Sequence, residues 1–249
     1  MANTHTANRQ PIPILVYHQI ANAPARGSPF RSLYVSPGAF ARQMAWLQRL
    51  GYTGLSMSRL QPYLSGEKEG KVVGITFDDG YQNNLTQALP ALLRQGFSST
   101  CYAVSGLLGQ TNAWDEMQGI AQTQLMTEAE IRQWVSAGQE IGSHTCNHVN
   151  LLATDDDGCR AEMAEGKTGL EAVVAQPVSH FCYPYGHYAD QHVDMARELG
   201  FVTATTTRRG RCHARADLLQ LPRVPVLRST SLPLFWLKIA TGYEDRRHP

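Results

Sequence analysis

The sequence predicts an α/β fold in which a mostly parallel sheet, covered by helices, closes into a barrel. Apolar runs typical of strands alternate with amphipathic helical stretches along the whole chain, as in parallel sheets with helical crossovers. The length of 249 residues favours a closed barrel over an open doubly wound sheet. Neither GxGxxG nor GxxxxGK[ST] occurs, which weakens nucleotide-binding alternatives.

Strands are predicted where short apolar or β-branched runs lie between turn residues. The first, PILVY, and the second, KVVGITF, fit this pattern best. In chain order, the predicted strands lie at 13–17, 71–77, 99–104, 140–142, 178–183, 201–205 and 221–226.

Helices are predicted from apolar periodicity and from their capping residues. Ser36 can cap a helix that has Pro37 in its first turn. Pro90, inside the helical stretch 83–95, indicates a kink or a late start. Thr127 and Glu130 form a capping box that opens the next helix. Further helices are predicted at 156–174, 189–199 and 232–239.

Two segments leave alternatives open. The apolar stretch 232–239 (LPLFWLKI) fits a buried C-terminal helix better than a membrane-surface or partner-binding patch. Residues 105–126 show no clear period and are too many for an ordinary loop, so we expect a lid or a substrate-binding wall. There Trp114 can stack on a ring of the substrate and Asp115 can bind its hydroxyl groups, or Trp114 can simply anchor the loop.

Composition fits a single domain, 1–249, with a disordered tail over residues 1–10. Lys and Arg total 22 and Asp and Glu 21, so no charge excess points to nucleic acid as a partner. The first residues lack the basic and apolar regions of a signal peptide, and no apolar run reaches the ~20 residues that span a bilayer. Five cysteines without CxxC fit free thiols. These features predict a cytoplasmic protein, although a trimmed leader would leave the same N-terminus; the oligomeric state stays open.

Polar clusters follow four of the predicted strands, at the point where each strand ends. In barrels of parallel strands, the active site is built from the loops at the carboxyl ends of the strands. We therefore expect these clusters to share one site. They are His18, Asp78-Asp79-Gly80, the segment from His144 to His148, and Tyr183-Pro184-Tyr185-Gly186.

The carboxylate pair and the histidine pair together suggest a metal site. Asp78 and Asp79 can serve one site if the strand has ended, since strand side chains alternate between faces and Gly80 permits a turn. His144 and His148 are four residues apart, so on a helical turn both imidazoles would share a face. Two histidines and one carboxylate leave an open position on Zn²⁺, as in catalytic sites. The alternatives are a polar turn and a polar loop pair.

Three segments resemble a known family. TFDDG at 76–80, SHTCNH at 143–148 and FCYPYG at 181–186 resemble, in order and spacing, the first three motifs of the polysaccharide deacetylases, the NodB-homology carbohydrate esterases. LVYH at 15–18 and LPRVPV at 221–226 are similar to the branch that deacetylates biofilm poly-N-acetylglucosamine. The resemblance implies a distorted (β/α) barrel with about seven parallel strands.

The resemblance also implies residue roles. Asp79, His144 and His148 would bind one divalent metal ion. Zinc is the expected ion, and cobalt and nickel are the alternatives. Asp78 would be the general base that takes a proton from the metal's water, which then attacks an amide carbonyl. The backbone N–H of Tyr185 would help to hold the oxyanion.

The sequence departs from the family pattern at two places. Cys182 stands where many members have an arginine that orients the base, which leaves the orientation of Asp78 unexplained. The Leu-x-x-His-Asp motif, which normally supplies the acid histidine, is absent. In the biofilm branch, whose barrel looks circularly permuted, a histidine on the first strand takes this place, so we expect His18 to be the general acid. His187 and His213 are the alternatives.

The remaining candidates have more limited roles. We expect Tyr185 and His187 to contact substrate together with Trp114 and Asp115. Cys146 is an alternative thiolate ligand, because it lies between two expected ligands. We expect His180 and His192 to be structural.

Together with these residues, the resemblance implies a metal-dependent hydrolase that removes an N-acetyl group from an amino sugar of a glycan, glycan precursor or glycolipid. One alternative is a deformylase or another amide hydrolase acting on a lipid-linked sugar or a small molecule. A second is a non-catalytic carbohydrate-binding relative, and a third is an unrelated α/β enzyme. We expect a carbohydrate as partner, and contact with a membrane only through a lipid-linked substrate.

Overall fold

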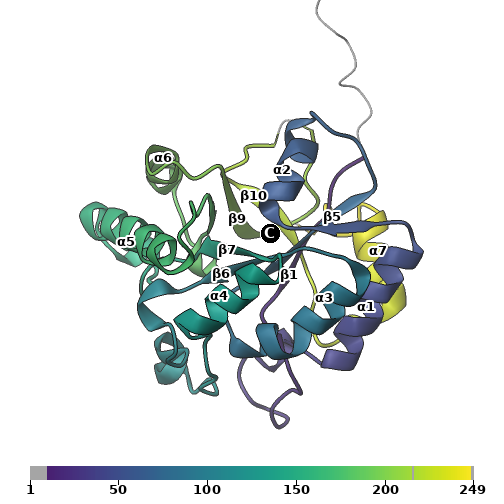
Figure 1. Ribbon diagram of the computed structural model, residues 1–249, viewed down its shortest axis with the longest axis horizontal. Helices are drawn as coiled ribbons and strands as arrows, with labels where there is room; N and C mark the ends of the chain where they lie inside the picture. The colour runs from purple at the N-terminus through teal and green to yellow at the C-terminus, as the bar shows by residue number, and fades with distance from the viewer. Residues whose placement is uncertain (1–9, 215, 248–249) are drawn as a thin grey trace, which may run out of the picture.

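The computed structural model describes residues 10–214 and 216–247, and its strands form a closed ring with helices around it (Figure 1). The ring runs β1-β10-β9-β8-β7-β6-β5 and closes where β5 pairs with β1. Each of these pairings is parallel. The predicted (β/α) barrel of about seven strands is therefore confirmed. Apart from Gln10, the tail predicted at 1–10 lies outside the described residues.

The strands of the ring are β1 (Ile14–Tyr17), β5 (Val72–Phe77), β6 (Thr100–Ala103), β7 (Glu140–Ser143), β8 (His180–Cys182), β9 (Thr203–Arg209) and β10 (Leu221–Pro225). Beside them, β4 (Thr53–Leu55) pairs with the first half of β5, and β2 (Gln19–Ile20) pairs with β3 (Tyr34–Val35). The α-helices are α1 (Pro37–Arg49), α2 (Met57–Ser65), α3 (Leu89–Gln95), α4 (Glu128–Ser136), α5 (Asp156–Val174), α6 (Asp190–Glu198) and α7 (Leu232–Ala240).

The capping signals in the sequence mark real helix ends. The Ser36 side chain accepts a hydrogen bond from the N–H of Ala39 at the start of α1, and Thr127 with Glu130 forms the predicted capping box of α4. Pro90 lies in the first turn of α3, after a π-helical turn at Asn84–Ala88, so the late start is confirmed. Within the described residues, no helix is both long enough and apolar enough to span a bilayer.

Sequence patterns missed or misplaced several elements. β4, α2 and the short β2–β3 pair were not predicted. α2 contains Pro62, which removes one backbone donor and hides the helical pattern. β9 begins two residues later than predicted and continues to Arg209 (predicted 201–205), while β8 spans only part of 178–183.

Aromatic packing holds the carboxyl end of β5 in place. The ring centroid of Phe77 lies 5.7 Å from that of Tyr17 on β1 and 5.9 Å from that of Trp134 on α4. These three side chains are fully buried. The N–H of Asp78 donates to the carbonyl of Tyr17 (3.0 Å), so β1 and β5 end together. The residue that follows each strand therefore lies at the same rim of the barrel.

Candidate active site

One cavity of about 410 Å³ lies at this rim. It is lined by loops that follow β1, β5, β7 and β8, and by the segment 105–126. The residues expected first as metal ligands, base, acid and substrate contacts all line it, namely His18, Asp78, Asp79, Trp114, Asp115, His144, His148, Tyr185 and His187.

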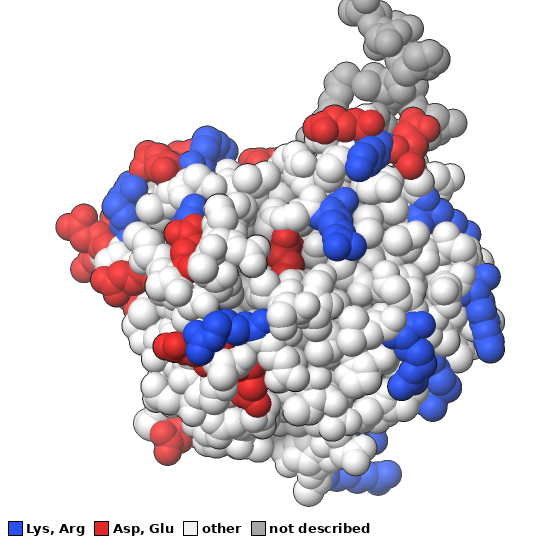
Figure 2. Space-filling model, viewed as in Figure 1, with Lys and Arg blue, Asp and Glu red and all other residues white. Residues whose placement is uncertain are grey.

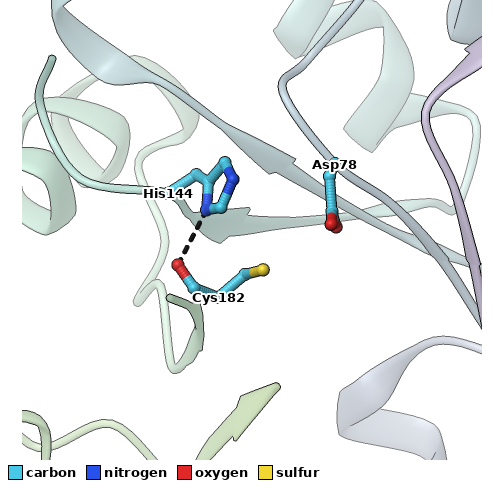
Figure 3. Close-up of side chains that lie close together, drawn as sticks. All are labelled: Asp78, His144 and Cys182. Atoms are coloured by element: carbon cyan, nitrogen blue, oxygen red, sulfur yellow. Dashed lines mark hydrogen bonds between the residues drawn. The ribbon is translucent and has the colours of Figure 1, made fainter. Parts of the chain in front are cut away.

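Asp79, His144 and His148 form a buried group that could hold a metal ion. The Nε2 atoms of both histidines lie 3.5 Å from Oδ1 of Asp79, and the three candidate ligand atoms lie within 4.8 Å of one another. Nδ1 of His144 is 2.7 Å from the carbonyl oxygen of Cys182 (Figure 3). Such a contact fixes the ring so that the other nitrogen faces the metal position. This donor set fits a divalent cation such as zinc.

Backbone twists, not helical spacing, bring these side chains together. The predicted helical turn between His144 and His148 is wrong, because this segment is a loop. Within it, Thr145 (φ 64°) and His148 (φ 57°) adopt left-handed conformations, as does Asp79 (φ 72°) after β5. Left-handed backbone at non-glycine residues is strained and clusters at functional sites. With this backbone, both Asp78 and Asp79, and both His144 and His148, line one cavity.

The electrostatics of this group suit a cation. Burial alone would raise the pKa of Asp79, but its contacts with His144 and His148 hold that pKa well below the ordinary value. Burial lowers the pKa of His148. Burial also opposes charge on His144, but the Cys182 thiol and Asp79 outweigh it and raise the pKa of His144. An imidazole must be neutral to bind a metal, so binding of a cation at His144 would displace the proton that Asp79 favours there, whereas His148 is already inclined to be neutral.

Asp78 is held by an arginine that the sequence analysis did not single out. Arg223 on β10 donates from its two terminal nitrogens to the two carboxylate oxygens, over 2.6 and 2.7 Å. Burial raises the pKa of Asp78, but Arg223 more than offsets this effect and lowers it overall. Arg223 also contacts the sulfur of Cys182 (3.3 Å). The orientation of Asp78, which Cys182 left unexplained, therefore comes from β10. The available signal was a single charged residue inside the apolar run LPRVPV.

A second group of candidate ligands overlaps the first. Asp78, His144 and Cys182, drawn in Figure 3, also bring one ligand atom each within 4.8 Å of the others. Both oxygens of Asp78 are already paired with the Arg223 guanidinium, and this cation would repel a metal ion placed beside them. The group that contains Asp79 is therefore the better metal site. Cys146 belongs to neither group.

His18 is the histidine that lies nearest to Asp78 among the candidates for general acid. Its Nε2 atom is 3.9 Å from Oδ2 of Asp78, and its side chain is 26% exposed at the cavity. His187 also lines the cavity, whereas His213 lies outside it beside Asp245. The alternative that placed His213 in the site is therefore wrong.

Two further histidines have structural contacts, as predicted. His180 contacts the hydroxyl oxygens of Ser58 and Thr203, each over 2.8 Å. Nδ1 of His192 accepts a hydrogen bond from the N–H of Ala189 at the start of α6.

Aromatic rings surround His148 at the mouth of the cavity. Trp114 stacks on the imidazole with a centroid distance of 4.4 Å and an interplanar angle of 21°. The Tyr185 ring meets it edge-on at 4.6 Å, from a backbone with φ 59°. Tyr185 lies in the first turn of a short 3-10 helix, Pro184–Gly186, where backbone N–H groups lack partners within the helix. Burial raises the pKa of the half-buried Asp115. The segment 105–126 therefore forms one wall of the cavity.

Comparison with known proteins agrees with this geometry. The polysaccharide deacetylase family model matches residues 65–204, more than half of the chain. The chain belongs to the polysaccharide deacetylase family. The matched segment contains Asp78, Asp79, His144, His148 and Tyr185, so the resemblance seen in the three motifs is confirmed.

Relatives match over longer stretches. The "Putative polysaccharide deacetylase YxkH" of Bacillus subtilis (strain 168) is 28% identical over 86% of this chain and 71% of its own length. The poly-beta-1,6-N-acetyl-D-glucosamine N-deacetylase of Escherichia coli (strain K12) is 23% identical over 86% of this chain, but this match spans 37% of that protein. The structure of the Streptococcus pyogenes deacetylase PplD in complex with acetate is similar with a TM-score of 0.81 and 27% identity, over 93% of this chain and 99% of that one.

Proposed function

We propose that this polysaccharide deacetylase family member is a metal-dependent hydrolase that removes an N-acetyl group from an amino sugar of a glycan, glycan precursor or glycolipid. The observation that carries this proposal is that one cavity contains both a set of candidate metal ligands and a separate carboxylate. The three candidate ligands converge within 4.8 Å, and a separate buried carboxylate, Asp78, lies beside them. The similarity to a deacetylase whose structure contains acetate supports the reaction class.

Asp79, His144 and His148 would hold the metal ion, with zinc, cobalt or nickel as the candidates. When bound, such an ion polarises a carbonyl group and lowers the pKa of a water. Nδ1 of His144 is held by the Cys182 carbonyl, so its Nε2 stays directed at the site without rearrangement.

The remaining steps fall to protein groups. Asp78 is held ionised by Arg223 and accepts the proton of the attacking water at a carboxylate oxygen. The Tyr185 N–H donates to the developing oxyanion, a role worth roughly 3–4 kcal/mol per donor in other enzymes. His18, next to Asp78 and in contact with solvent, gives a proton to the departing amine nitrogen. Trp114, together with Asp115 and His187, would contact the sugar.

Acetate release from a panel of N-acetylated saccharides, with formate measured in parallel, tests the proposal. We expect acetate from the wild type, none from D78N, and an unchanged metal content in D78N. Formate alone would favour a deformylase, and release of neither acid, with saccharide binding retained, would favour a non-catalytic relative. Loss of metal in D78N would show that Asp78 is a ligand and not the base.

A further inference from the structure

Three segments of the chain contribute basic and apolar side chains but no carboxylate side chain to the surface. Residues 1–66, 80–114 and 218–243 contain no Asp or Glu at all. These segments supply α1, α3, α7 and the loop 21–33. We call the surface that they form the arginine face. Its arginines are Arg26, Arg31, Arg42, Arg49, Arg94 and Arg228.

The arginine face is continuous in space. α1 packs against both α3 and α7, and Figure 1 shows the three helices side by side. In the same view, Figure 2 shows blue and white surface over these helices, whereas red gathers over α5 and α6. Arg42 and Arg49, seven residues apart on α1, point to the same side of that helix.

These arginines are available to a partner. All of them are exposed except Arg31, which is half-buried and donates to the carbonyl of Pro24. In the described part of the chain, the ion pairs of arginine involve other residues, mainly around α5, α6 and the C-terminal segment. No ion pair among the described residues therefore neutralises the positive charge of the arginine face.

Large apolar side chains lie among the arginines. The exposed fractions are 52% for Phe30, 51% for Leu93 on α3 and 44% for Trp236 on α7. Phe235 and Ile239 on the same helix are buried, so α7 fills the core with one side and exposes Trp236 on the other. Phe30 and Leu33 also line the candidate active site, so the arginine face borders the mouth of the cavity.

We propose that the arginine face docks on an anionic lipid bilayer. Membrane binding by surface helices combines attraction between basic residues and anionic headgroups with burial of exposed aromatic and aliphatic side chains, and the arginine face offers both. A soluble polyanion would use the arginines but would leave Trp236 and Leu93 without a role. Because the net charge is only +1, the attraction comes from the separation of charge between the two sides of the molecule. The sequence analysis, by contrast, expected membrane contact only through a lipid-linked substrate.

Co-sedimentation of the full chain with vesicles tests this proposal. We expect binding to phosphatidylcholine vesicles that contain phosphatidylglycerol, roughly tenfold or more above binding to phosphatidylcholine alone, and weaker binding as salt rises. R42E/R49E should lower binding by about tenfold or more, and W236S should also lower it. The matched control R160E/R197E makes the same change in net charge on α5 and α6 and should bind like the wild type.

Three results would overturn the proposal. The first is no binding to anionic vesicles at low salt. The second is a loss of binding in R160E/R197E as large as that in R42E/R49E. The third is full displacement of the protein from vesicles by dextran sulfate, with no effect of W236S on binding. The last result would assign the arginine face to a soluble polyanion. Neither Arg42 nor Arg49 lines the cavity, so hydrolysis of a soluble substrate by R42E/R49E should equal that of the wild type. Failure of docking is thus distinguishable from failure of the proposed catalysis.

Discussion

Replacing Arg223 with methionine tests how the proposed base is held. The guanidinium donates to both oxygens of Asp78 over 2.6 and 2.7 Å, and the two side chains are 1% and 5% exposed. Two unit charges about 4 Å apart at an effective dielectric constant of about 20 interact by about 4 kcal/mol. Removing one partner of a buried pair typically costs about 3–5 kcal/mol. We therefore expect R223M to lower the free energy of unfolding by about 3–5 kcal/mol at pH 7.

The size of this loss should depend on pH. In the wild type the pKa of Asp78 is lowered, so the pair stabilises the fold above the ordinary Asp pKa, and this stability is lost as pH falls through the folded pKa. Without Arg223, burial dominates and raises the pKa of Asp78. The stability of R223M is then lost as pH rises from the ordinary Asp pKa through the raised folded pKa. The difference in the free energy of unfolding between R223M and the wild type therefore shrinks toward about pH 4. The acid limb of kcat/KM should move to higher pH.

Urea unfolding across pH and the pH profile of hydrolysis measure both effects. R223M/D78N, which removes both charges, should recover part of the lost stability, so that a double-mutant cycle gives the coupling directly. R223K retains a charge but not the bidentate contact, so its free energy of unfolding should lie between those of R223M and the wild type. If R223M unfolds within about 1 kcal/mol of the wild type and its pH profile does not move, Arg223 does not hold Asp78.

Three further substitutions separate the other roles. H18Q should slow turnover by roughly 100-fold or more with metal content unchanged, and near-normal rates would move the acid role to His187. W114A should weaken metal binding by about tenfold in calorimetry, whereas W114F should not. The Trp114 ring stacks on His148, whose Nδ1 lacks a hydrogen-bond partner in the described chain, so the stacking is what orients this imidazole. Equal metal affinities of W114A and the wild type would contradict this role. E244Q should lower the free energy of unfolding by about 3 kcal/mol, because Glu244 is fully buried against two cationic side chains. The metal affinity of E244Q should not change, and a change would show that the surroundings of Glu244 are coupled to the candidate metal site.

The position of the site could be predicted because it depends on a rule that acts locally. Each cluster stands at the end of an apolar run, and parallel strands bring their ends to one rim. The segments that begin at His18, Asp78, His144 and Tyr183 could therefore be assigned to a common cavity without knowing the order of strands in the sheet. The order itself, with β10 between β9 and β1, was not visible in the sequence.

The histidine pair shows where local reasoning reached the right residues through the wrong geometry. Spacing of four suggested a helical turn, but the imidazoles meet because Thr145 and His148 adopt positive φ. Nothing in residue type favours positive φ at a threonine. The loop that contains Thr145 packs closely on α5, where a Cβ on Gly166 would meet the backbone of Thr145 at 2.6 Å. Such tertiary constraints are outside the reach of propensity.

Arg223 could not be assigned for a related reason. Its contact with Asp78 joins residues 145 positions apart, and it exists because the ring closes. β1 pairs with β5 on one side and with β10 on the other, with Leu15 opposite both Ile75 and Val224. A charged residue in an apolar strand can equally point outward to solvent, so the sequence alone does not show which side of the barrel wall it occupies.

The family match, which spans residues 65–204, leaves out part of the site. Residues 65–204 contain all three candidate metal ligands and Asp78. Asp78 is flanked by His18, directly after β1, and by Arg223 on β10, and both lie outside that match. The candidate metal ligands thus lie in loops within the matched segment, whereas the charge state of the proposed base depends on the first and last strands of the ring meeting beside β5. Strands that pair across the closure of the barrel therefore contribute to the proposed chemistry as well as to the fold.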